Sequence, residues 1–296
     1  MLKVFYSKSQ SVKSNSSFSP SAGKPELVVE SWKRRRQLFQ ISDFAPVTRD
    51  DLKLVHDPKY VDGVLDLTSS NGFGNKNADV AKALPWVCGS MVAAALEAFK
   101  NKSITISPTS GAHHARYSNG GGFCTFNFLV LAAIKAHQAG AKKVGIIDLD
   151  CHYGDGTQDI LSTLKLDFIK HYSYGGDPIA YRDSKAWLEN LPAIVQGFQD
   201  CDLIIYNAGV DSHTEDPLGG YLTTEQIEMR DCLVIQAPNL KRVPMVISLA
   251  GGYQKDEEGG ISKVLELHGL VFNAAWFADK LSQDENSEVA PESFLA

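Results

Sequence analysis

Side chains that bind metal ions and move protons are concentrated in four short segments of this 296-residue chain. These segments are Gly-Ala-His-His at 111–114, Asp-Leu-Asp-Cys-His-Tyr-Gly-Asp-Gly at 148–156, Asn-Ala-Gly-Val-Asp at 207–211 and Ala-Gly-Gly-Tyr at 250–253. Asp150, His152 and Asp211 together offer one imidazole nitrogen and two carboxylates. Three protein ligands with one position left for water are typical of a catalytic zinc site. The four segments therefore predict a catalytic zinc site.

The spacing of Asp150 and His152 supports this interpretation, because residues two apart in an extended backbone point to the same side. Asp-x-His arises by chance in many proteins, but here it follows an apolar strand and is matched by a second strand-end aspartate. Alternatively, Asp148, Asp150 and Asp155 cap a helix that begins near Thr157, and His152 is an ordinary loop histidine. That alternative explains one aspartate only. It also leaves several carboxylates buried without the cation or hydrogen-bond donors that they need.

The predicted elements bring the four segments together. Short β-branched runs alternate with helical patterns from about residue 100 onward, which predicts an α/β fold with a single open parallel sheet flanked by helices. Strands are predicted at 3–5, 103–107, 143–147, 168–172, 203–206 and 243–249, and helices at 26–40, 57–67, 78–100, 132–139, 223–237 and 261–281. The polar segments follow strands, and the carboxyl ends of parallel strands share one edge, where ligands bind.

Composition limits the classes of function. The 44% hydrophobic and 22% charged content suits one globular domain, predicted at 1–281, followed by an acidic tail at 282–296 that we expect to be disordered. A formal net charge of −6 and a pI near 5.8 predict no direct binding to nucleic acid or to a membrane surface. No apolar run is expected to span a membrane, and five scattered cysteines do not predict disulfides, so a cytoplasmic location is expected.

In the order and wording of these segments the chain resembles the histone deacetylase family, which has the arginase–deacetylase fold. The matching segments lie at 111–114, 122–124 (Gly-Phe-Cys), 148–156, 208–211, 216–220 (Asp-Pro-Leu-Gly-Gly) and 251–253. They form a highly specific set, and weaker similarity at 56–60 extends the resemblance across most of the chain. The residues of these motifs are most similar to those of class IV-like bacterial deacetylases. Two departures are Tyr153, where the family often has a second histidine, and residues 109–110, where it often has Arg-Pro.

The resemblance implies a role for each polar residue of the site. The implied ligands of a single zinc ion are Asp150, His152 and Asp211. The implied acid–base residues are His113 and His114, oriented by Asp148 and Asp155 respectively, together with Tyr253 as a donor to the substrate carbonyl. An Asp–His contact fixes the imidazole tautomer and brings its pKa toward neutrality, where a general base works best. A potassium ion beside Asp148 is also implied.

The resemblance further implies that Gly122 and Phe123 line a narrow tunnel for an acyl-lysine side chain and that Leu218 lies at its rim. Considered alone, Tyr253 is more often a structural residue, but Gly251 and Gly252 before it at a strand end favour the functional role. Phe123 could also be a core residue, and residues 216–220 an ordinary turn. The predicted function is zinc-dependent hydrolysis of an N-acyl amide by a metal-activated water, with the histidine pair as general acid and base and the tyrosine as oxyanion donor. The predicted substrate is an acylated lysine of a protein.

Three other functions remain as alternatives. The first is hydrolysis of a small acylated amine such as an acetylpolyamine, because the rim loops at 69–77 and 174–183 do not reveal the substrate. The second is a non-catalytic module that binds acylated ligands, although no residue of the site is missing. The third is an arginase-type hydrolase with two manganese ions, which would need a bridging aspartate where this chain has Gly154.

Overall fold

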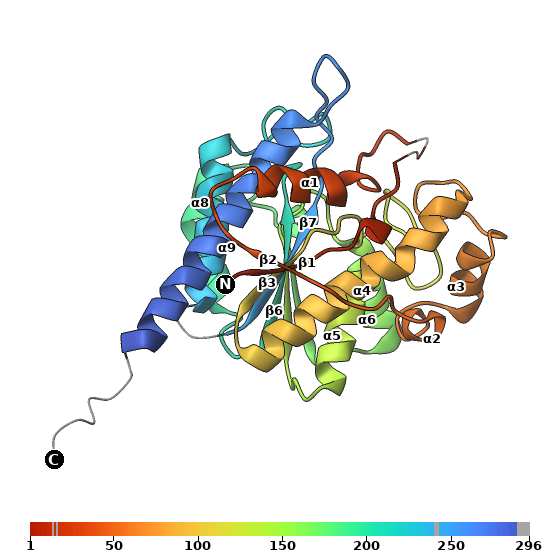
Figure 1. Ribbon diagram of the computed structural model, residues 1–296, viewed down its shortest axis with the longest axis horizontal. Helices are drawn as coiled ribbons and strands as arrows, with labels where there is room; N and C mark the ends of the chain where they lie inside the picture. The colour runs from red at the N-terminus through yellow and green to blue at the C-terminus, as the bar shows by residue number, and fades with distance from the viewer. Residues whose placement is uncertain (14, 16, 240–242, 289–296) are drawn as a thin grey trace.

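A seven-stranded sheet organises the computed structural model, which describes residues 1–13, 15, 17–239 and 243–288 (Figure 1). The strands are β1 (Lys3–Phe5), β2 (Gln40–Ser42), β3 (Ile104–Ser107), β4 (Val144–Asp148), β5 (Ile169–Ser173), β6 (Leu203–Gly209) and β7 (Met245–Ala250). Their order across the sheet is β2-β1-β3-β7-β6-β4-β5, and every pairing among them is parallel. The predicted open parallel sheet is therefore confirmed.

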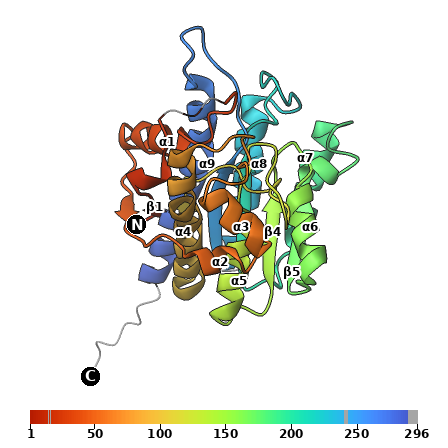
Figure 2. The same cartoon turned by 90° about the vertical axis from the view of Figure 1, so that its right-hand side faces the viewer.

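Helices cover both faces of the sheet (Figures 1 and 2). One layer contains α1 (Lys24–Lys33), α7 (Ser184–Gln196), α8 (Thr224–Asn239) and α9 (Ser262–Glu288). The opposite layer contains α2 (Arg49–Leu52), α3 (Pro58–Leu65), α4 (Ala78–Asn101), α5 (Phe128–Gln138) and α6 (Asp155–Leu164). Two short 3-10 helices, η1 (Lys8–Gln10) and η2 (Tyr174–Gly176), lie in the connections.

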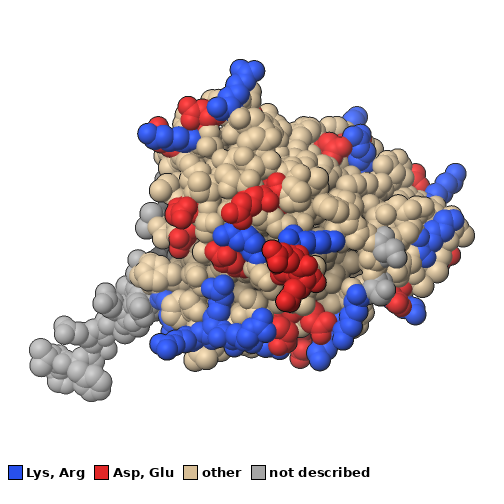
Figure 3. Space-filling view, turned by 90° about the horizontal axis from the view of Figure 1, so that it is seen from above, with Lys and Arg blue, Asp and Glu red and all other residues tan. Residues whose placement is uncertain are grey.

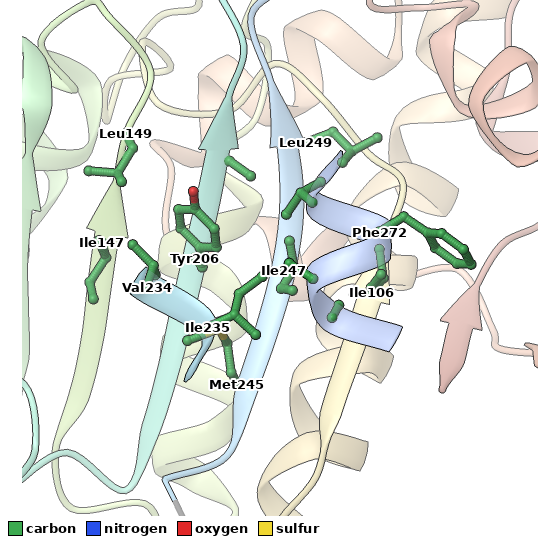
Figure 4. Packing of buried hydrophobic residues seen from close by; sticks show 14 of the residues in the cluster. Ile106, Ile147, Leu149, Tyr206, Val234, Ile235, Met245, Ile247, Leu249 and Phe272 are labelled. Carbon is green, nitrogen blue, oxygen red and sulfur yellow. The ribbon is translucent and has the colours of Figure 1, made fainter. Parts of the chain in front are cut away.

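The central strands are buried on both faces, which explains their nearly continuous apolar sequences. Alternate residues of each strand point to opposite layers. On one face, Ile147 and Ile247 pack with residues of α8 and α9 such as Val234 (Figure 4). On the other face, Ile146 and Val246 pack with α4 and α5. Burial on both sides gives the sheet a rigid edge on which the site is built.

Several element boundaries differ from the predicted ones. The helix predicted at 26–40 ends at Lys33, and the chain continues into β2, which pairs with β1. Helix α7 was not among the predicted helices. Helix α9 continues to Glu288, past the predicted domain boundary at residue 281. The remainder of the predicted disordered tail, 289–296, lies outside the described residues.

Helix α4 bears on the expectation that no segment spans a membrane. Among the described residues it is the one helix long and apolar enough to cross a membrane, as judged over an 18-residue window of its 24 residues. However, 61% of that window is buried inside the protein, where α4 packs on α5 and β3. The core helix of a globular protein meets the same criteria of length and composition, so this helix is weak evidence for a membrane span.

Candidate functional site

Four adjacent strands carry the predicted site residues. The order β3-β7-β6-β4 places the loops that follow these strands side by side at the carboxyl edge of the sheet. Figure 3 views the molecule from above, and basic and acidic side chains are interspersed on this face. The four polar segments of the sequence therefore converge on one site, as parallel strands require.

The three predicted metal ligands lie in contact with one another. The Nδ1 atom of His152 lies 3.0 Å from Oδ1 of Asp150 and 2.9 Å from Oδ2 of Asp211. Both carboxylates are buried, whereas His152 is partly exposed. Cys151 belongs to the same group of potential ligand atoms, all within 4.8 Å of one another. Its thiol, however, is 3.6 Å from the carbonyl oxygen of Leu218 and is a weak hydrogen-bond donor there.

The charges of this group suit a divalent cation. Burial and the neighbouring Asp150 raise the pKa of Asp211 above its ordinary value. Burial opposes the ionisation of Asp150, but His113 and His152 outweigh it and lower the pKa of Asp150. Hydrogen bonds that the imidazole donates to Asp150 and Asp211 raise the pKa of His152 to about 10. A proton on His152 thus lies between two buried carboxylates, where a cation bound to all three side chains would neutralise them.

Each histidine of the pair is backed by the predicted aspartate. Nδ1 of His113 lies 2.8 Å from Oδ2 of Asp148, and Nδ1 of His114 lies 2.6 Å from Oδ1 of Asp155. With Nδ1 engaged, Nε2 of each ring is left for the reaction, and Nε2 of His113 is 3.6 Å from Oδ1 of Asp150. The two ring centroids are 4.1 Å apart. Both imidazoles therefore lie at the predicted metal centre with a defined orientation.

The two histidines differ in electrostatic surroundings. Burial opposes a charge on His113, but Asp150 and Asp148 outweigh it and raise the pKa of His113 to about 9. Burial and the charge of His113 lower the pKa of His114. A bound cation would neutralise the carboxylates that raise the pKa of His113, and would so weaken their effect. His114 is the histidine that remains neutral near pH 7.

Asp148 is held by a buried chain of hydrogen bonds that the sequence analysis missed. The side-chain amide of Asn207 donates to Oδ1 of Asp148 at 2.7 Å, and the hydroxyl of Ser248 donates to Oδ1 of Asn207 at 2.9 Å. The backbone N–H of Asp150 also donates to Oδ1 of Asp148, at 3.2 Å. The arrangement orients Asp148 toward His113. It gives no support to the potassium ion predicted here, which stays a prediction.

The loop that carries Tyr253 depends on two glycines. Gly251 and Gly252 have φ values of +54° and +86°, a region that favours glycine. A Cβ atom on Gly251 would lie 2.3 Å from Cγ of Asp211, so the backbone packs directly on a predicted metal ligand. The N–H of Tyr253 donates to Oδ2 of Asp216 at 2.7 Å. Burial raises the pKa of Tyr253 well above its ordinary value, so its hydroxyl stays protonated and can donate.

The predicted substrate-binding residues lie around this group. Phe123 has a φ of +65°, which is strained for a bulky residue and is often found at functional sites. Its ring lies 5.7 Å from that of Tyr253 and 6.2 Å from that of Phe73, measured between centroids. Gly122 packs on His114, where a Cβ atom would meet Cδ2 at 2.5 Å. Leu218 is 42% exposed, as a rim position requires.

Two residues at the site carry no signal in the sequence. Lys24, at the start of α1, is buried, and burial lowers its pKa to about 8 against the pull of Asp211. Its ammonium group donates to the carbonyl of Gly251 and, at 3.2 Å, to the hydroxyl of Ser110. The ring of Phe18 stacks on that of Tyr253 with centroids 6.0 Å apart. Both come from the first 25 residues, far in sequence from every recognised segment.

A small cavity and an open groove meet at Tyr253. The cavity measures about 10 Å³, room for roughly one water molecule, and is lined by Lys24, His113, Asp150, Phe123 and Tyr253, among others. The groove measures about 600 Å³, and Phe18, Pro217 and Lys255 contribute to its walls. The inner site is therefore narrow and enclosed, whereas the surface outside Tyr253 is open.

Comparisons with known proteins identify relatives of this chain. The family model of the histone deacetylase domain matches residues 21–172, just over half of the chain. Histone deacetylase 15 of Arabidopsis thaliana is 30% identical over a 216-residue alignment that covers 58% of this chain and 38% of that protein. Acetylpolyamine amidohydrolase 2 of Pseudomonas aeruginosa is 30% identical over 189 residues, covering 53% of each chain. This chain thus spans about half or less of these two relatives.

The structural comparison extends the likeness over nearly the whole chain. The crystal structure of the HDA15 HD domain aligns with a TM-score of 0.69 and covers 98% of this chain and 99% of that one. At 20% sequence identity this likeness shows the fold alone. The matched family model shows family membership, which the fold alone does not show. This chain belongs to the histone deacetylase domain family.

Proposed function

We propose that this protein is a zinc-dependent amidohydrolase that removes the acyl group from N-acyl-lysine. The observation that carries the proposal is the convergence of Asp150, His152 and Asp211 beside two imidazoles that are each backed by a carboxylate. The family supports deacetylation of amides in general, since relatives are named as histone deacetylases and as acetylpolyamine amidohydrolases. Hydrolysis of the amide yields a carboxylate and a free amine.

Zinc held by these three side chains would supply Lewis-acid polarisation of the carbonyl and of a water molecule. The protein's own groups supply the proton transfers. His114, which is neutral near pH 7, accepts the proton of the attacking water through Nε2 and returns it to the leaving nitrogen. His113 stays fixed by Asp148 and presents its Nε2 to the same space. Each transfer then occurs at a defined atom.

Tyr253 would stabilise the negative charge that develops on the carbonyl oxygen. Its raised pKa keeps the hydroxyl protonated, and the Gly-Gly turn together with Asp216 fixes the backbone that carries it. A donor that is already in place costs no reorganisation during the reaction. The adjacent ring of Phe123 provides an apolar wall suited to the methylene chain of lysine.

A small acylated amine is the second candidate substrate, favoured by the 30% identity to acetylpolyamine amidohydrolase 2. A panel of peptides with acetyl-lysine and longer acyl-lysines, assayed beside acetylated polyamines, separates the two. We expect turnover of acyl-lysine peptides by protein that contains one zinc per chain. Faster turnover of the polyamines would favour the second candidate.

The metal assignment is tested with Asp150→Ala and Asp211→Ala, which each remove an anionic ligand and should abolish zinc binding and turnover. Turnover by either variant with one zinc still bound would overturn the metal assignment. Binding of acylated peptides without turnover by zinc-loaded wild-type protein would indicate a non-catalytic module instead.

A further inference from the structure

Arg230 is a fully buried arginine that the proposed reaction does not use. It lies on α8 with 0% of its surface exposed, under the carboxyl edge of the sheet. A buried guanidinium is costly unless its charge is paired and its N–H groups find acceptors. Nε and Nη2 both bind Oδ1 of Asp231, at 2.9 and 2.8 Å. The charge is therefore paired, and Nη1 is free to reach other acceptors.

The acceptors of Nη1 lie on the two backbone segments that carry the acidic metal ligands. Nη1 donates to the carbonyl of Gly209 at 2.5 Å and reaches the carbonyl of Leu149 at 3.4 Å. It also lies 3.2 Å from the hydroxyl of Ser212. Leu149 directly precedes Asp150, whereas Gly209 and Ser212 lie on either side of Asp211. One nitrogen thus connects the backbones that hold both carboxylates.

These segments need such a connection, because β4 and β6 end here. The N–H of Leu149 donates to the carbonyl of Asn207 at 3.0 Å, and beyond it β4 no longer pairs with β6, although β6 stays paired with β7 as far as Gly209. Gly209 packs so closely that a Cβ atom would lie 2.3 Å from Cα of Asp150. Carbonyl groups beyond a strand end need partners from outside the sheet. Figure 4 shows Leu149 and Tyr206 on neighbouring strands, on the face that packs against α8.

We propose that Arg230 is a positioning residue of the metal centre, which holds Asp150 and Asp211 at ligand spacing through the carbonyls of Leu149 and Gly209. The inference rests on the proposed metal site and adds to it a group that touches no substrate. Arginine remains charged at every pH that the protein survives, so the connection is permanent. Its planar fork also reaches acceptors in two directions, which a lysine ammonium cannot reproduce.

The test compares Arg230→Lys with Tyr206→Phe. Lysine keeps a positive charge beside Asp231 but loses the fork. Tyr206 is the matched control, because its hydroxyl donates to Oδ1 of Asp231 at 2.5 Å in the same buried cluster but contacts neither carbonyl. For each folded protein, the zinc dissociation constant is measured by competition with a chelator. The visible spectrum of the cobalt-loaded form reports ligand geometry independently of turnover.

We expect Arg230→Lys to weaken zinc binding by about ten- to a hundredfold, as is typical when groups that orient metal ligands are changed. Its cobalt spectrum should also change, while Tyr206→Phe keeps wild-type affinity and spectrum. A folded Arg230→Lys with wild-type affinity would overturn the inference, as would an equal loss in Tyr206→Phe. If Arg230→Lys does not fold, the double variant Arg230→Gln with Asp231→Asn removes the charge pair together and is measured in the same way. Wild-type protein that takes up no metal would overturn the proposed function as well.

Discussion

Gly251→Ala offers a direct test of how the Tyr253 loop and the metal centre fit together. A Cβ atom at this position would lie 2.3 Å from Cγ and 2.5 Å from Oδ1 of Asp211, both on the carboxylate proposed to bind zinc. Ordinary van der Waals contact begins near 3.4 Å, so the methyl group and the carboxylate must separate by about 1 Å. Zinc–oxygen bonds are about 2.0–2.2 Å long, so a shift of this size removes Asp211 from coordination.

The substitution also strains the backbone, and the two effects can be separated. Alanine at the φ of +54° costs about 1–2 kcal/mol of unfolding free energy. Gly259 is a matched control in the same connection, with a φ of +81° and open space around its Cα. Gly259→Ala should therefore lose about 1 kcal/mol of stability while keeping zinc and turnover. Gly251→Ala should lose a similar amount of stability and, in addition, the metal.

The expected outcome for Gly251→Ala is a zinc affinity lower by about a hundredfold or more and a comparable loss of kcat/KM, since a misplacement of about 1 Å has effects of that size. Urea denaturation, chelator competition and deacylation assays measure the three quantities on one preparation. Gly251→Ala that is folded, binds one zinc and turns over at the wild-type rate would refute the close packing of Gly251 on Asp211.

Three further predictions address separate parts of the chain. His114→Ala should lower kcat by about two to four orders of magnitude with zinc content unchanged, and loss of the metal would show that His114 is a ligand instead. Tyr253→Phe should lower kcat by about a hundredfold with a much smaller change in KM, and full kcat on an acyl-lysine peptide would make Tyr253 structural. Burial lowers the pKa of His56 to about 4. In the unfolded chain the pKa of His56 is about 6.5, so between about pH 6.5 and 4 the unfolded chain binds this proton and the folded protein does not. Lowering the pH across this range should therefore lower the free energy of unfolding by up to about 3 kcal/mol. Urea denaturation at pH 7 and 5 checks this, and a His56→Gln variant with the same pH dependence as the wild type would contradict it.

The central strands were predictable because a strand that is buried on both faces requires a continuous run of apolar residues. Strands β3 and β4 begin within one residue of their predicted starts for this reason. Strand β2 was missed because it has three residues, of which Gln40 and Ile41 are exposed. No apolar pattern marks it, and its pairing with β1 comes from the tertiary fold.

The convergence of the site could be anticipated, but not its arrangement. Each polar segment follows a strand, which predicts a common edge without giving the order of strands. The insertion of β7 between β3 and β6 brings Gly251 onto Asp211, and nothing local in the sequence specifies this order. Asn207 lies inside one of the polar segments, yet nothing in the sequence indicates its contact with Asp148.

Buried cations explain how loops beyond the strand ends remain fixed. Among the described residues, only one lysine and one arginine are buried, Lys24 and Arg230. Both lie in the helical layer that contains α1 and α8. Lys24 binds the carbonyl of Gly251, and Arg230 those of Leu149 and Gly209. Each carbonyl lies within two residues of a proposed ligand or of Tyr253. The sheet brings the site residues to one edge. Side chains of the adjacent helical layer then donate hydrogen bonds to the backbone carbonyls that the sheet no longer pairs.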